Sequence, residues 1–188
     1  MTAEPKPAIG GCGPVTVYTI GHSTRAITEF GALLTDCAVQ LVADVRSIPR
    51  SRANPQFNIE TLPASLAAFG VSYQHLPELG GRRHRPRSAP PSPNTFWRNE
   101  SFRNYADYTA TDAFKTGITR LEELARHQCC AIMCAETLWW RCHRRIISDY
   151  LLERGIEVLH IMGPSQVEPA ILTSNAHRLT DGTLVYPA

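Results

Sequence analysis

Short apolar segments alternate with helical segments along most of this chain, and this alternation limits the possible folds more than any other feature. Five segments are apolar and rich in β-branched residues, as buried strands are: 15–20, 41–45, 71–75, 129–134 and 156–161. Apolar residues at helical spacing predict helices at 28–37, 61–69, 102–108, 111–127 and 141–154. Such alternation predicts an α/β fold, a three-layer sandwich around a mostly parallel sheet of about five strands.

The length of 188 residues suits one domain with a sizeable core. We expect this domain to span 15–188, after a flexible Pro/Gly-rich tail at 1–14. A Pro/Arg-rich loop is expected at about 79–99, and loops of this length are usually functional or disordered. A further short helix is expected at about 170–176.

The composition favours a cytoplasmic protein with no membrane partner. No apolar run approaches the ~18 residues of a membrane span, and the first residues lack the pattern of a secretory signal. The cysteines, at 12, 37, 129, 130, 134 and 142, are too sparse for a disulfide scaffold, so reduced thiols are expected.

Arginine is concentrated in one part of the chain. The net charge is only +2, but residues 41–105 hold nine arginines against four acidic residues. Arginine binds phosphate and carboxylate groups through two parallel hydrogen bonds. A GC-rich genome would explain the preference for arginine over lysine, but not this clustering.

Polar residues follow the carboxyl ends of the predicted strands, where parallel α/β sheets bind their ligands. They are Gly21, His22 and Ser23; Asp44 and Arg46; His75 and Glu78; Cys134 and Glu136; and His160. A single polar strand end is as often merely solvated, but the whole set predicts a shared site. Gly21, His22 and Ser23 could present backbone N–H groups to an anion. Asp44 could orient Arg46 towards one, or the two could form a structural ion pair.

Cys142 and His143 are predicted in the first turn of a helix, where the dipole favours a thiolate and bound anions. Cys142 is therefore a candidate nucleophile, or alternatively a core residue of the helix–sheet interface. Because neighbours on a helix point about 100° apart, His22 or His160 is preferred to His143 as its base. Glu136 could act as a general base or orient an arginine.

A metal site could use Cys134, Cys142 and His143. Their spacing is unlike that of zinc modules, so no metal is predicted and the cofactors stay unassigned.

Several motifs resemble the DUF488 family of bacterial and archaeal proteins. They are Thr19-Ile-Gly-His-Ser23, Asp44-Val-Arg46, Leu76-Pro-Glu-Leu-Gly-Gly81, and Met133-Cys-Ala-Glu136 followed by Cys142-His-Arg144. The resemblance spans about 15–160, and the loop at 82–93 looks like an expansion of a family loop. It implies an α/β fold and no particular activity. Its signature positions are His22, Ser23, Asp44, Arg46, Glu136, Cys142, His143 and Arg144.

The leading hypothesis is an enzyme acting on an anionic, phosphate-bearing substrate, such as a nucleotide or nucleic-acid end, at the carboxyl edge of the sheet. Its catalytic residues would be Cys142, Glu136 and His22. Its anion-binding residues would be Gly21, Ser23, Asp44, Arg46, His143 and Arg144. One alternative is a nucleic-acid-binding module using arginines within 82–87 with Trp97, Trp139 and Trp140. The other is a thiol redox sensor built on Cys134 and Cys142. The oligomeric state is not predicted.

Overall fold

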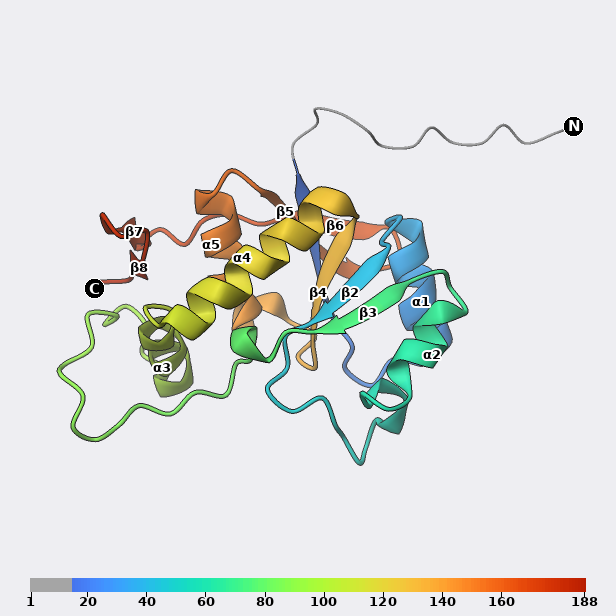
Figure 1. Ribbon diagram of the computed structural model, residues 1–188, viewed down its shortest axis with the longest axis horizontal. Helices are drawn as coiled ribbons and strands as arrows, with labels where there is room; N and C mark the ends of the chain where they lie inside the picture. The colour runs from blue at the N-terminus through green and yellow to red at the C-terminus, as the bar shows by residue number, and fades with distance from the viewer. Residues whose placement is uncertain (1–14) are drawn as a thin grey trace, which may run out of the picture.

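A mixed sheet forms the centre of the molecule (Figure 1). The computed structural model describes residues 15–188, so the tail expected at 1–14 lies outside the described residues. Within the described part, six strands pair in the order β3-β2-β4-β1-β5-β6. They are β1 (Thr16–Gly21), β2 (Leu41–Asp44), β3 (Ser72–His75), β4 (Cys130–Cys134), β5 (Glu157–Gly163) and β6 (Gln166–Pro169). The first five run parallel and β6 runs antiparallel to β5, which confirms the predicted mostly parallel sheet.

Helices cover both faces of this sheet. On one face lie α1 (Ile27–Asp36) and α2 (Leu62–Ala67), and on the other lie α4 (Asp112–His127) and α5 (Arg144–Glu153). The remaining helices are α3 (Glu100–Tyr108) and the short 3-10 turns η1 (Pro55–Phe57), η2 (Pro77–Leu79) and η3 (Trp139–Arg141). Alternate residues of β4 enter the two cores, since Ile132 packs with α4 and α5 while Met133 packs with α1 and α2. The predicted three-layer sandwich is thereby confirmed.

The C-terminal segment differs from the prediction. The helix expected at 170–176 is wrong, and a two-stranded sheet of β7 (His177–Arg178) and β8 (Leu184–Val185) follows β6 instead. The buried carboxylate of Asp149 on α5 accepts hydrogen bonds from the Thr173 backbone N–H at 2.9 Å and the Tyr186 hydroxyl at 3.0 Å. The backbone N–H of Thr173 is therefore satisfied by a side chain of α5 rather than by a hydrogen bond within a local helix.

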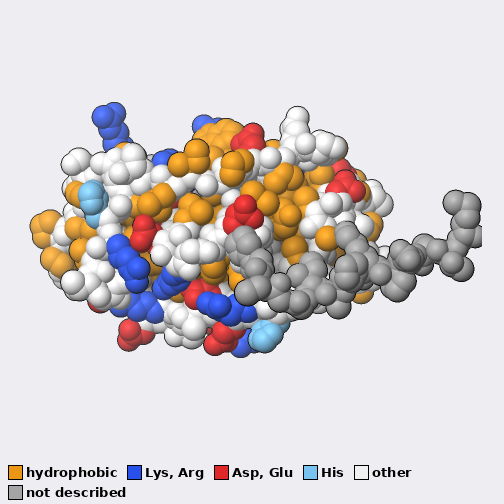
Figure 2. Space-filling view, turned by 90° about the horizontal axis from the view of Figure 1, so that it is seen from above, with side chains coloured by type: hydrophobic (Ala, Val, Ile, Leu, Met, Phe, Trp, Pro, Cys, Tyr) orange, Lys and Arg blue, Asp and Glu red, His pale blue; other side chains and the backbone are white. Residues whose placement is uncertain are grey.

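The surface carries charges of both signs. Basic and acidic side chains are intermingled along one edge of the face seen in Figure 2. Within residues 15–188, no helix combines the length and the apolar character that crossing a bilayer requires.

Gly21 ends β1 at a point where the chain passes very close to the turn after β4. A Cβ atom at this position would lie 2.0 Å from the carbonyl oxygen of Glu136. We expect Gly21→Ala to lower the free energy of unfolding by about 1–3 kcal/mol, because backbone must move to admit the methyl group. Urea unfolding measures this. Gly163→Ala is the control, with 3.4 Å to the nearest atom, and equal losses in the two variants would contradict the explanation.

His160 on β5 is buried, with Nδ1 2.8 Å from Thr19 Oγ1 and its ring stacked on Trp139. Burial, helped by the charge of Arg144, lowers the pKa of His160 from 6.5 to about 4. The unfolded chain therefore takes up the proton first as the pH falls. We expect the free energy of unfolding to decrease between pH 6.5 and 4, by up to ~1.4 kcal/mol per pH unit for this residue.

Denaturant unfolding across this pH range, in the wild type and in His160→Gln, separates the contribution of His160. In His160→Gln the free energy of unfolding should still decrease as the pH falls, but less steeply than in the wild type. The remaining decrease comes from His22, because burial also lowers its pKa to about 4. Parallel slopes would show that His160 does not titrate differently in the folded and unfolded states.

Candidate functional site

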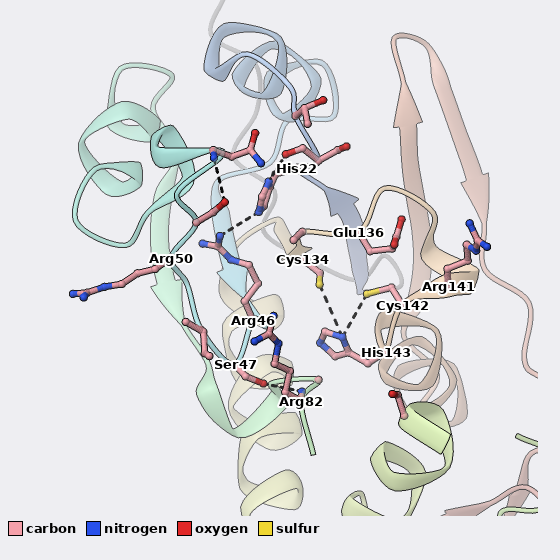
Figure 3. Close-up of a pocket in the computed structure, with 18 of the residues that line it drawn as sticks. His22, Arg46, Ser47, Arg50, Arg82, Cys134, Glu136, Arg141, Cys142 and His143 are labelled. Carbon is pink, nitrogen blue, oxygen red and sulfur yellow. Dashed lines mark hydrogen bonds between the residues drawn. The ribbon is translucent and has the colours of Figure 1, made fainter. Parts of the chain in front are cut away.

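A pocket of about 560 Å³ opens at the carboxyl ends of β1, β2 and β4 (Figure 3). His22 and Ser23 follow β1, and Arg46 follows β2. The sequence-predicted residues that line it are His22, Ser23, Arg46, Glu136, Cys142 and His143, together with Cys134. The structure thus brings residues far apart in the sequence to one cavity, whereas Gly21, Asp44 and Arg144 do not line it.

Asp44 and Arg46 form a buried ion pair beside this pocket. Arg46 Nη2 lies 2.5 Å from Asp44 Oδ2, and Nε also contacts the carboxylate. Arg46 Nη2 also donates to the Phe57 carbonyl at 2.7 Å, and Nη1 lies 3.1 Å from His22 Nε2. Four of the five guanidinium N–H groups thus have acceptors inside the protein, which leaves one on Nη1 for a ligand. Asp44 orients Arg46 and also serves as its structural partner.

His22 is held as a neutral imidazole. Its Nδ1 lies 2.9 Å from the carbonyl oxygen of Ser23, so Nδ1 carries the proton and Nε2 accepts from Arg46. Burial lowers the pKa of His22 to about 4, and the ring stacks on Phe57 at 4.2 Å. Because Arg46 occupies its lone pair, His22 fits a positioning role better than that of a base for Cys142.

The backbone N–H groups after β1 do not form the predicted anion cradle. The N–H of His22 donates to the Cys134 carbonyl at 2.9 Å, and that of Ser23 donates to the Ala135 carbonyl at 3.0 Å. Gly21 is needed for the close approach to Glu136. This part of the prediction is wrong because β1 continues its pairing with the β4 segment, which uses these donors.

Arg144 lies beneath the pocket and is only 1% exposed. Its Nη2 donates to the carbonyls of Glu136 and Thr137, and its Nε donates to Cys142 Sγ at 3.4 Å. Its guanidinium is therefore engaged inside the protein. We assign Arg144 to positioning the 136–137 turn and Cys142 rather than to binding an anion.

The helix predicted from residue 141 begins later. Residues Trp139–Arg141 form η3, Cys142 has extended backbone (φ −127°, ψ 149°), and α5 starts at Arg144. Cys142 and His143 are therefore not neighbours on a helix, and Cys142 Sγ lies 3.4 Å from His143 Nδ1. The argument against His143 as the partner of Cys142 is wrong for this reason.

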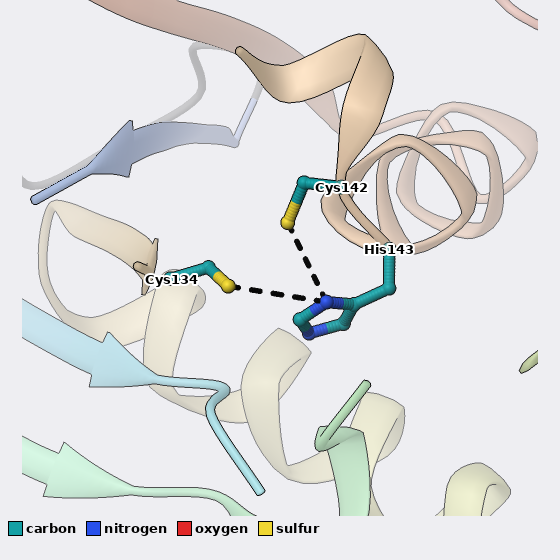
Figure 4. A group of neighbouring side chains, drawn as sticks. All are labelled: Cys134, Cys142 and His143. Carbon is teal, nitrogen blue, oxygen red and sulfur yellow. Dashed lines mark hydrogen bonds between the residues drawn. The ribbon is translucent and has the colours of Figure 1, made fainter. Parts of the chain in front are cut away.

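Cys134, Cys142 and His143, which all line the pocket, form a cluster (Figure 4). Cys134 Sγ lies 4.0 Å from His143 Nδ1, and all three atoms lie within 4.8 Å of one another. Burial alone would raise the pKa of Cys142, but the Cys134 thiol, His143 and Arg144 together hold that pKa well below its usual value. A hydrogen bond to Cys142, with burial, raises the pKa of Cys134. The cluster therefore favours a thiolate at Cys142.

Two arginines that line the pocket are not among the anion-binding residues of the leading hypothesis. Arg82 and Arg141 are both exposed there, and within the described residues neither has an ion pair. Arg50 also lines the pocket but pairs with Glu60. The position of Arg82 directly after Gly80-Gly81, in the segment that follows β3 and η2, was the available signal for it.

The basic loop and the tryptophans do not form a stacking surface. Arg83 donates to the carbonyls of Pro77, Glu78 and Gly80 and lies over the Tyr108 ring, while Arg85 pairs with Asp107. The tryptophans are mostly occupied too: Trp97 is buried, Trp139 stacks on His160, and Trp140 is 43% exposed. These contacts weaken the nucleic-acid-binding alternative.

One comparison with known proteins gives a match. The family model described as "Domain of unknown function DUF488" matches residues 26–151. The matched range includes Arg46, Glu136 and the cysteine–histidine cluster, and begins after His22 and Ser23. No curated protein and no solved structure matches the chain.

The buried Asp44–Arg46 pair predicts a large effect of a small change. We expect Asp44→Asn to lower the free energy of unfolding by about 3–5 kcal/mol, because it leaves the Arg46 charge buried without its counter-ion. Glu60→Gln is the matched control, since it breaks the exposed Arg50–Glu60 pair and should cost less than ~1 kcal/mol. Chemical denaturation compares the two, and a small loss in Asp44→Asn would contradict a stabilising role for the pair.

Proposed function

The chain belongs to the DUF488 family, and we propose that it is an enzyme that binds a small anionic substrate in the pocket above Cys142. The observation that carries this proposal is the shared location of two kinds of group. Two sulfurs and an imidazole line one cavity together with Arg82 and Arg141, which form no ion pair within residues 15–188.

The charge of the lining supports an anion as the substrate. Arg82 and Arg141 are exposed there, Arg46 has one free N–H, and Glu136 is the only acidic residue of the described lining. Guanidinium groups bind phosphate and carboxylate through charge-assisted hydrogen bonds. The volume of about 560 Å³ falls in the range of small-molecule sites. A phosphate-bearing molecule such as a nucleotide or nucleic-acid end fits both properties.

The residues divide into three roles under this proposal. Cys142, with Cys134 and His143, forms the reactive centre. Glu136, which is exposed at the pocket, supplies a carboxylate for proton transfer. His22, Asp44 and Arg144 position Arg46 and Cys142 through the contacts described above.

A thiol redox sensor is the second candidate. It is favoured by one observation, the approach of the Cys134 and Cys142 sulfurs to within 4.8 Å of each other. This candidate needs no bound anion, so measurements of anion binding distinguish it from the enzyme.

The arginines of the lining provide the test. We expect Arg82→Gln and Arg141→Gln each to weaken the binding of inorganic phosphate and of adenosine monophosphate about tenfold, as loss of a charge-assisted hydrogen bond implies. Isothermal titration calorimetry measures the affinity. Arg178→Gln, an exposed arginine of β7 outside the pocket, is the matched control. The proposal fails if the wild type binds neither ligand, or if all three variants bind equally well.

A further inference from the structure

We propose that Cys134, Cys142 and His143 bind one zinc ion, with the fourth coordination position open to the pocket. The site itself is argued from these three side chains alone, whereas the ion's role in handling an anion rests on the function proposed above. Zinc sites of this openness use three protein ligands and leave one position for water or substrate.

The distances between the ligand atoms suit a tetrahedral ion. A Zn–S bond of about 2.3 Å and a Zn–N bond of about 2.0 Å place sulfur and nitrogen about 3.5 Å apart and two sulfurs about 3.8 Å apart. Cys142 Sγ and Cys134 Sγ lie 3.4 and 4.0 Å from His143 Nδ1, and no pair of ligand atoms is separated by more than 4.8 Å. The two sulfurs and the nitrogen therefore need only small side-chain shifts to share one ion.

His143 Nδ1 can form a hydrogen bond with only one of the two sulfurs that lie beside it. His143 Nε2 lies 2.9 Å from the carbonyl oxygen of Val45, which only accepts, so Nε2 carries a proton. Nδ1 then offers one lone pair or one proton, yet two sulfurs point at it (Figure 4). A metal ion between the three atoms satisfies all of them at once.

The surroundings of the cluster are those of a metal site. Histidine ligands usually donate their second ring N–H to a carbonyl or carboxylate, as His143 does to Val45. Arg144 Nε donates to Cys142 Sγ, which stabilises a thiolate ligand. Gly81 leaves room for the imidazole, since a Cβ there would lie 2.3 Å from His143 Nδ1. These contacts hold the ligands in place before an ion arrives.

The donor set selects the ion, and the cavity supplies its open face. Two thiolates and an imidazole favour zinc over magnesium or calcium, which prefer oxygen ligands. All three ligands line the pocket that also holds Arg82 and Arg141. Two thiolates neutralise the ion, so the arginines provide the positive charge that attracts an anion, and the ion offers a position for one of its oxygen atoms.

The sequence analysis set this site aside because its spacing is unlike that of zinc modules. Cys134 comes from the end of β4, and the other two ligands come from the segment before α5. The strand and this segment meet only in the folded protein.

Metal content tests the proposal directly. The full chain, kept reduced, is incubated with Zn²⁺, freed of excess ion by gel filtration and assayed by mass spectrometry of the metal. We expect about one zinc per chain, and its loss in Cys134→Ser, Cys142→Ser and His143→Gln. Cys129→Ser is the matched control, since Cys129 is also a free cysteine but lies outside the pocket.

Co²⁺ provides a readout that does not depend on the folding of these variants. The wild type with Co²⁺ should show the intense visible bands of a tetrahedral ion and thiolate-to-cobalt charge-transfer bands. Gly81→Ala keeps all three ligands but displaces the imidazole, and we expect it to weaken zinc binding about 10–100-fold in a chelator competition.

Three results would overturn the proposal: a reduced wild type that retains no zinc, cobalt spectra without charge-transfer bands, or equal zinc loss in Cys129→Ser. Absence of zinc with phosphate affinities that still depend on Arg82 and Arg141 would refute the metal site alone. One zinc per chain with phosphate binding that ignores both arginines would refute the proposed function alone.

Discussion

The pairing of β4 with both β1 and β2 is the constraint on which the site depends. Its parallel register sets Gly21 beside Cys134 on one side and Asp44 beside Met133 on the other. Three strands therefore end at the same level, and the residues that follow them enter the same cavity. The alternation of β4 between the two cores fixes this register, because a slip of one residue would exchange its faces.

Two buried arginines brace this edge from within. Arg46 joins Asp44, His22 and the chain at Phe57, while Arg144 joins the turn after β4 to Cys142. A buried guanidinium is costly unless nearly all its donors are satisfied. Here acceptors from several segments offset the cost of burying each guanidinium. Both arginines are therefore satisfied only when these segments have come together in the folded site. Arg82 and Arg141, which are exposed in the lining, form no ion pair within residues 15–188.

The alternation of apolar segments was enough to predict the layers and the parallel strands, since it reflects local burial. The Asp44–Arg46 contact was also within reach, because the two residues lie on one side of an extended chain end. The start of α5 could not be predicted, because helical periodicity does not show where a preceding 3-10 turn ends. The prediction therefore placed Cys142 and His143 inside the helix, whereas they precede it. The hydrogen bonds of the His22, Ser23 and Thr173 backbone N–H groups could not be predicted either, because their acceptors are distant in the sequence.

Three consecutive residues at the end of β2 serve three different neighbours. The Asp44 side chain pairs with Arg46, the Val45 carbonyl accepts from His143, and the Arg46 carbonyl lies 2.8 Å from His75 Nε2. The lengths of chain on either side of these contacts must therefore stay matched for all three contacts to form. A deletion or insertion within this short stretch would turn each group towards the wrong neighbour. The chain just after β3 is fitted to the same stretch, because the Leu76 N–H donates to the Asp44 carbonyl at 2.9 Å.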